Sequence, residues 1–128
     1  MKSFTLVLMS MLVTLVASAC ASTQPITEPV SVIEAFYEAL NDGDLDTAMS
    51  FIADDAKFIL GTLHPGKPQI RDFYQEGLRV NLHSELSDLR ADGDKVSWTG
   101  KVTLGGGTFE DAYEAVVQKG MILSLTPR

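Results

Sequence analysis

Five aspartates stand in the stretch ALNDGDLDTAMSFIADDA, and such a density of carboxylates suggests a metal site or a catalytic group. The spacing of Asp42, Asp44 and Asp46 resembles the start of a calcium-binding loop. Such a loop has glycine at its sixth position and glutamate at its twelfth. Those two positions are Thr47 and Ala53 in this chain. The sequence therefore argues against a calcium site here, and we expect no metal and no cofactor.

Acid–base chemistry has three other candidate groups. His64 lies in a loop rich in glycine and proline, where it is either exposed to solvent or placed at a cavity. His83 falls on the strand face opposite Leu82 and Leu86, so we expect it to be exposed. Asp88 is in phase with those leucines and either faces inward, where apolar neighbours would raise its pKa, or serves as a turn residue. Asp88 and His64 form the one enzymatic pair that the sequence allows.

The chain has 128 residues, which leaves room for one domain. Residues 1–19 contain Lys2, an uncharged apolar run and a small-residue zone, the layout of a secretory signal. Residues 20–28 are small and polar and predict a flexible tether, and residues 29–128 remain for the domain. Removing Lys2 with the signal changes the formal net charge from −7 to −8. Such a surface repels nucleic acid and anionic lipid headgroups.

Cys20, the only cysteine, lies where signal cleavage would create a new N-terminus. The residues ASAC resemble a bacterial lipobox, whose cysteine is acylated and holds the protein at a membrane. Ala17 departs from that pattern, which has a large aliphatic residue there, and Ala17 with Ala19 also forms a site for plain secretion. We expect a lipid anchor on Cys20 in the cell envelope, with free secretion as the alternative.

Helical periodicity comes first along the predicted domain, and strand periodicity follows. Apolar residues at helical spacing predict helices over 29–43, 44–56 and 68–78, with Asp44 as an N-cap. A short strand is expected at 56–60, a loop at 61–68, and later strands at 80–90, 95–104, 109–118 and 121–127. The tract of three glycines at 105–107 is expected to be a turn. Helices followed by antiparallel strands predict an α+β fold.

Three stretches resemble the nuclear transport factor 2-like superfamily in its SnoaL-like branch. They are FYEALNDGDLDTAMSFIADDAKF, GKPQIRDFY and the terminal KGMILSLTP. The resemblance implies a cone-like fold, in which a curved, mainly antiparallel sheet wraps round the helices and leaves a cavity at its wide end. It also implies a homodimer through the sheet in many members, although the polar alternation of Ser97, Thr99 and Lys101 does not favour an apolar interface here. Members include isomerases, cyclases, dehydratases and binding domains, so fold alone does not assign function.

The resemblance to ketosteroid isomerases can be tested at two positions. The proton-shuttling aspartate of those enzymes corresponds to Leu60, which cannot move a proton. Their oxyanion-donating tyrosine corresponds to Phe36, which has no hydroxyl. Tyr37 is adjacent, but one helical step turns a side chain by about 100°, so we expect it to point elsewhere. Both groups that acid–base catalysis requires are missing at these positions.

Two functions remain for the predicted domain. The first is a non-catalytic lipoprotein of the cell envelope that binds a small apolar ligand or a protein partner. The alternative is an enzyme of isomerase, cyclase or dehydratase type, acting on a hydrophobic carbonyl compound with Asp88 or His64 as acid or base. We favour the first. For either function, the residues expected to contact the ligand are Tyr37, Leu60, His64, Phe73, Trp98 and Tyr113.

Overall fold

The computed structural model describes residues 25–128, so the expected signal over 1–19 and Cys20 lie outside the described residues. The helices are α1 (Pro29–Asn41), α2 (Leu45–Ser50) and α3 (Lys67–Arg79). The strands are β1 (Ile52–Leu60), β2 (Thr62–Pro65), β3 (His83–Asp92), β4 (Lys95–Leu104), β5 (Gly107–Gln118) and β6 (Met121–Pro127). This is the expected α+β arrangement, with helices first and a run of strands after.

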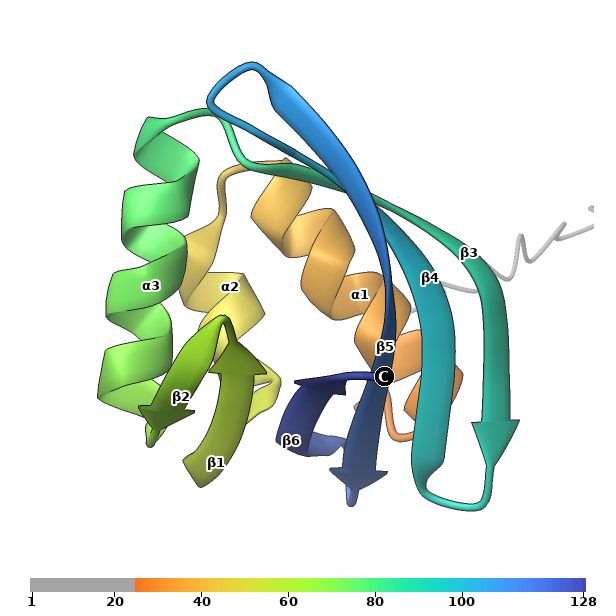
Figure 1. Cartoon of the computed structure of the whole chain (residues 1–128). Coiled ribbons are helices and arrows are strands. Elements are labelled where there is room, and N and C mark those ends of the chain that lie inside the picture. Colours follow the sequence, from red (N-terminus) through yellow and green to blue (C-terminus); the bar gives the residue numbers. More distant parts are fainter. Residues whose placement is uncertain (1–24) are drawn as a thin grey trace, which may run out of the picture.

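The strands form one curved sheet in the order β2-β1-β6-β5-β4-β3. The β1–β6 pair is parallel and the other pairs are antiparallel, which confirms a mainly antiparallel sheet. The long strands β3, β4 and β5 arch around α1. At the other end of the same concave face, α3 lies beside β1 and β2 (Figure 1). This is the predicted cone-like fold.

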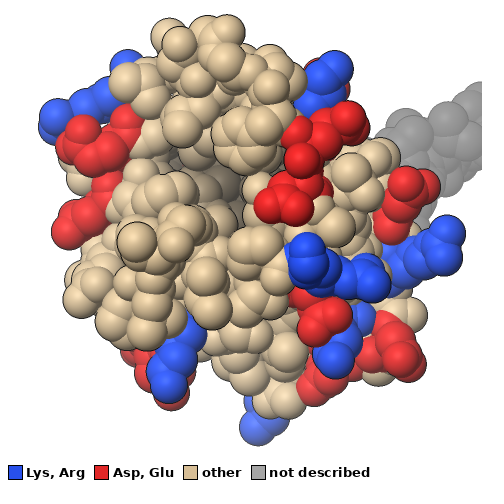
Figure 2. Space-filling view, viewed as in Figure 1, with Lys and Arg blue, Asp and Glu red and all other residues tan. Residues whose placement is uncertain are grey.

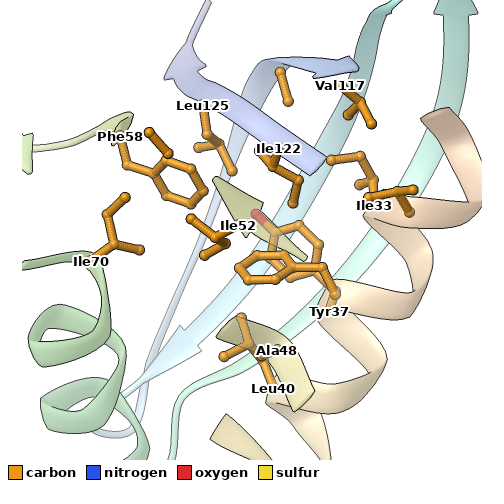
Figure 3. Packing of buried hydrophobic residues seen from close by; sticks show 14 of the residues in the cluster. Ile33, Tyr37, Leu40, Ala48, Ile52, Phe58, Ile70, Val117, Ile122 and Leu125 are labelled. Carbon is orange, nitrogen blue, oxygen red and sulfur yellow. The ribbon is translucent and has the colours of Figure 1, made fainter. Parts of the chain in front are cut away.

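The core lies between α1 and the concave face of the sheet. The predicted apolar stripe of α1 is confirmed, because Val32, Ile33, Phe36, Tyr37 and Leu40 are all buried. Figure 3 shows their neighbours converging on this stripe from β1, α3 and β6. Phe36 is fully buried and meets the rings of Phe58 and Tyr74 edge to face. The packing of these aromatic rings holds the bottom of the cavity in place.

Two expected elements between 44 and 68 are wrong. The second helix ends at Ser50 rather than at residue 56, and Asp54 and Asp55 lie on β1. The backbone N–H of Ile122 donates to the carbonyl of Phe51 at 2.7 Å, so pairing with β6 overrides the local helical preference. The expected loop contains β2, which turns back at Gly61 and pairs with β1. That hairpin places His64 on a strand.

The aspartates of the opening stretch have structural roles. Asp44 caps α2 as predicted, since its carboxylate accepts from the backbone N–H of Thr47 at 3.1 Å and from the Thr47 hydroxyl at 2.6 Å. These hydrogen bonds lower the pKa of Asp44. Asp46, in the first turn of α2, contacts Arg71 of α3 at 2.6 Å. Asp54 and Asp55 are exposed on β1.

Asn41 joins the end of α1 to the sheet. Its side-chain amide donates to the carbonyl of Ser84 at 2.7 Å, and the backbone N–H of Ser84 donates back to the Asn41 carbonyl oxygen at 2.9 Å. This paired contact satisfies both backbone groups of a residue that is 6% exposed. It fixes the position of β3 where that strand borders the cavity.

Candidate binding cavity

An open cavity of about 980 Å³ lies between α3 and the concave face of the sheet. This volume is at the upper end of the roughly 300–1,000 Å³ that small-molecule sites span. In Figure 2 a hollow opens in this face, with a wall largely free of charged side chains and with acidic side chains near its edge. The apolar and aromatic wall residues are Tyr37, Leu60, Phe73, Tyr74, Val80, Leu82, Val102, Leu104, Phe109, Tyr113 and Pro127.

The structure brings together five of the six predicted ligand-contacting residues. Tyr37, Leu60, His64, Phe73 and Tyr113 all line the cavity, although they come from α1, β1, β2, α3 and β5. The sixth residue, Trp98, is 3% exposed and lies behind this wall. Its indole stacks on Tyr113 at a centroid distance of 5.9 Å and meets Tyr37 edge to face at 5.8 Å. Trp98 therefore supports the two tyrosines that face the cavity.

Tyr37 and Phe36 point in different directions, as one helical step requires. Tyr37 lines the cavity, whereas the fully buried Phe36 is absent from the wall. Burial raises the pKa of Tyr37 well above its ordinary value, and the charge of Tyr113 adds to this effect. Burial likewise raises the pKa of Tyr74, which also lines the cavity. Both phenols keep their protons at neutral pH. A hydrogen bond between the two hydroxyls raises the pKa of Tyr74 and lowers that of Tyr37, so Tyr74 is the donor and the Tyr37 hydroxyl is left to donate to a ligand.

Leu60 also faces the cavity. The position at which the isomerases hold their proton-shuttling aspartate is therefore apolar in this wall. An apolar side chain at this point can contact a ligand, but it cannot take a proton from one.

His64 is the histidine of the cavity wall. It lies on β2 opposite Phe58, and its ring packs on Phe73 at a centroid distance of 4.8 Å. Its Nε2 atom is buried and has no hydrogen-bond partner among the described residues. A buried polar atom without a partner costs about 1–3 kcal/mol. A ligand with a polar group at this position would remove that cost.

Asp88 does not join His64 at the cavity, so of the two alternatives for Asp88 the inward-facing one is wrong. Asp88 is exposed and is not part of the cavity wall. The register of β3 shifts between Ser87 and Arg90, and the φ angle of Asp88 is 55°, so a β-bulge breaks the alternation that predicted an inward side chain. His83 is exposed, as expected. The enzymatic pair suggested by the sequence is therefore not assembled.

Three carboxylates of the wall were not predicted. Asp72 and Glu76 lie one turn apart on α3, and Asp111 lies on β5 between Phe109 and Tyr113. The period-two phase of β5 would have indicated Asp111, since residues 109, 111 and 113 share one strand face. The side chains of α3 gave no such signal, because the sequence does not show which face of that helix the sheet leaves uncovered.

Gly100 allows the Tyr113 ring to lie against the sheet. A Cβ atom at Gly100 would lie 2.9 Å from Cε2 and 3.1 Å from Cδ2 of Tyr113, and 3.7 Å from Nε1 of Trp98. The first two distances are shorter than an ordinary contact between carbon atoms. The indole N–H of Trp98 has no hydrogen-bond acceptor within the part of the chain that the structure describes. Because Gly100 has no side chain, the Tyr113 ring can lie close to the sheet, and this leaves the cavity deeper.

The fold and the cavity at its wide end define a protein of the nuclear transport factor 2-like class. The family model of the SnoaL-like domain matches residues 33–122, and the chain belongs to this family. A comparison with curated proteins finds no match.

Similar solved structures share the fold. An NTF2-like protein of unknown function from Cytophaga hutchinsonii superposes with a TM-score of 0.73 at 18% identity, covering 84% of this chain and 92% of that one. A protein provisionally assigned as a polyketide cyclase from Sinorhizobium meliloti gives 0.69 at 22% identity, covering 77% and 94%. A computationally designed 17-OHP binder gives 0.70 at 15% identity, covering 78% and 88%. One fold thus carries both a provisionally assigned enzyme and a binder.

Within 25–128 no helix is long and apolar enough to cross a membrane. In the same range no three His, Cys, Asp or Glu side chains are grouped so as to hold a metal ion.

Proposed function

We propose that this protein is a non-catalytic lipoprotein of the cell envelope that binds a small apolar ligand in the cavity between α3 and the sheet. The observation that carries the proposal is the wall itself, which is mainly apolar and aromatic and includes Leu60, at the position that the family resemblance assigns to the base of an isomerase. A cavity of about 980 Å³ holds a ligand of drug or steroid size. The designed 17-OHP binder supports this function as an example of binding on the same fold.

The polar groups of the wall fix orientation rather than drive a reaction. Tyr37 and Tyr74 offer hydroxyl groups that remain protonated, and His64 offers an unpaired Nε2 atom. A few polar groups within an apolar wall are typical of small-molecule sites. The preferred ligand is therefore apolar over most of its surface and carries a hydrogen-bonding group.

Binding is tested with N-phenyl-1-naphthylamine, a neutral apolar fluorophore. The mature chain carrying Cys20→Ser is titrated, and probe emission is followed together with quenching of Trp98, the only tryptophan. Trp98 lies directly behind the cavity wall, so a ligand in the cavity changes its emission. The proposal predicts saturable binding with Trp98 quenching. An absence of saturable binding would count against it.

An enzymatic function has one observation in its favour, the unpaired Nε2 atom of His64 beside the cavity. The alternative is thus an enzyme acting on a hydrophobic carbonyl compound, with His64 as acid or base. A general test is deuterium exchange at the carbon next to the carbonyl group of a cyclic enone in heavy water, followed by NMR. Exchange that the protein accelerates and that His64→Gln abolishes would establish the enzyme. Exchange at the rate of buffer alone supports the binding function.

Anchoring through Cys20 is a separate part of the proposal. The described chain reaches the domain beside the β5–β6 turn, where a Cβ atom at Gly120 would lie 2.8 Å from the carbonyl oxygen of Ile26. That turn is at the opposite end of β5 from Phe109, which borders the cavity. A tether that joins the domain at this turn would therefore not block the cavity on the side formed by β4 and β5. Detergent partitioning tests the anchor: the unmodified chain should enter the detergent phase and Cys20→Ser should leave it.

A further inference from the structure

The charged side chains of the cavity wall are all acidic. Among the described residues the wall contains Asp72, Glu76 and Asp111, and it contains no lysine or arginine. Glu76 contacts Arg79 at 3.3 Å, which offsets part of its charge. Asp72 and Asp111 form no ion pair within residues 25–128. Two uncompensated carboxylates therefore face any molecule that enters.

Asp111 lies next to the aromatic part of the wall. It shares a strand face with Phe109 and Tyr113, both of which line the cavity. Burial raises the pKa of the Tyr113 phenol, and the nearby charge of Asp111 raises it further. On α3, Asp72 also lines the cavity. A cation beside Asp111 would lie on the strand face that carries Phe109 and Tyr113, and aromatic faces attract cations.

From this arrangement we propose that the cavity accepts apolar molecules whose head group is neutral or cationic, holds that group at its acidic wall, and discriminates against otherwise identical molecules that carry a carboxylate. This inference rests on the proposed binding function and adds the ligand class to it. The net charge of the chain, −7, acts in the same direction on an approaching anion. Figure 2 shows acidic side chains near the edge of the hollow.

Three ligands that differ only in the head group test the proposal: dodecylamine, dodecanol and dodecanoate. The measured quantity is the displacement of the neutral naphthylamine probe from the mature Cys20→Ser chain at neutral pH. Each ligand is used below its own micelle concentration. An exposed carboxylate changes the affinity of a charged partner by about twofold to fivefold. Two carboxylates that attract the amine and repel the carboxylate therefore predict a gap of about tenfold or more between these two ligands.

Matched variants locate the effect. Asp72→Asn with Asp111→Asn should reduce the gap between amine and carboxylate to about a third or less of its original ratio. Glu110→Gln removes the same charge from the neighbouring residue of β5, which is not part of the wall, and should change the gap by less than about twofold. Added salt should narrow the gap, because it screens exposed charges.

Each outcome is decisive. Dodecanoate binding as tightly as dodecylamine overturns the inference while leaving the binding function intact. If Glu110→Gln narrows the ratio between amine and carboxylate affinity as much as Asp72→Asn with Asp111→Asn does, the effect belongs to overall charge and the local site is overturned. Failure of all three ligands to displace a bound probe overturns the inference and leaves the binding function intact, whereas an absence of saturable probe binding removes both. Tight binding of the amine and the alcohol with weak binding of the carboxylate supports the proposal.

Discussion

Replacing Gly100 with alanine should push the Tyr113 ring into the cavity. The added Cβ atom would lie 2.9 Å and 3.1 Å from two carbon atoms of that ring. Carbon atoms rest at about 3.5–4.0 Å, so the ring must retreat by roughly 0.6 Å or more. The sheet lies behind Gly100 and the cavity lies in front of Tyr113, so the ring moves toward the cavity. It also leaves its stack on Trp98.

The expected cost of Gly100→Ala is about 1–3 kcal/mol of unfolding free energy, as for other overpacked sites. The affinity for the naphthylamine probe should fall as well, because the displaced ring occupies ligand volume. Urea denaturation followed by Trp98 fluorescence measures the first effect. Trp98 is the only tryptophan and stacks on Tyr113, so its emission before denaturation also reports the displacement.

Gly107→Ala is the matched control for this experiment. A Cβ atom there would meet only the carbonyl oxygen of Leu104 at 3.6 Å, an ordinary contact, so stability should change by less than about 0.5 kcal/mol. A double-mutant cycle with Tyr113→Val isolates the clash, since Gly100→Ala should cost much less once the ring is gone. An equal cost of Gly100→Ala in both backgrounds would refute the argument.

Three further predictions concern the supports of the cavity. Asn41→Ala should lower the unfolding free energy by about 1–3 kcal/mol in urea denaturation, because both backbone groups of Ser84 lose their partner; no measurable loss would show that water replaces the amide. Above pH 10 the unfolding free energy should fall by about 1 kcal/mol per pH unit for each of Tyr37 and Tyr74, because unfolded tyrosine ionises there while the raised pKa values keep the folded phenols protonated. Tyr37→Phe should make this fall with pH less steep. An unchanged dependence on pH would contradict the assignment. His64→Leu should leave the ligand-free protein at least as stable in thermal denaturation, because Nε2 has no partner to lose; a loss above about 2 kcal/mol would reveal a partner.

Patterns within the sequence predicted most of the fold because they depend on local periodicity. The helical stripe of α1 and the alternation of β4 are long and regular, and both elements formed as expected. The errors lie where long-range pairing decides the structure. Residues 51–55 have helical preference but join β6 through the carbonyl of Phe51. Residues 62–65 look like a loop but pair with β1.

The cavity was harder to predict than the fold. Tyr37, Leu60 and Tyr113 were identified as wall residues through the resemblance and their residue types, and the structure places them together. Periodicity left the inward position open for Asp88, and the structure excludes it because a single bulge in β3 shifts every later side chain by one position. Gly100 carries no chemical signal in the sequence, since its effect depends on Tyr113 of the neighbouring strand.

The central claim is that the cavity between α3 and the sheet binds an apolar ligand, and the most direct measurement is the dissociation constant of the naphthylamine probe for Val102→Arg. Val102 lines the cavity, so a long charged side chain there both fills it and makes it polar. Ile59→Arg makes the same kind of change at a residue that is 41% exposed and outside the wall. We expect Val102→Arg to weaken binding of the probe by about tenfold or more and Ile59→Arg to leave it unchanged. Equal affinities for the two folded variants would contradict it.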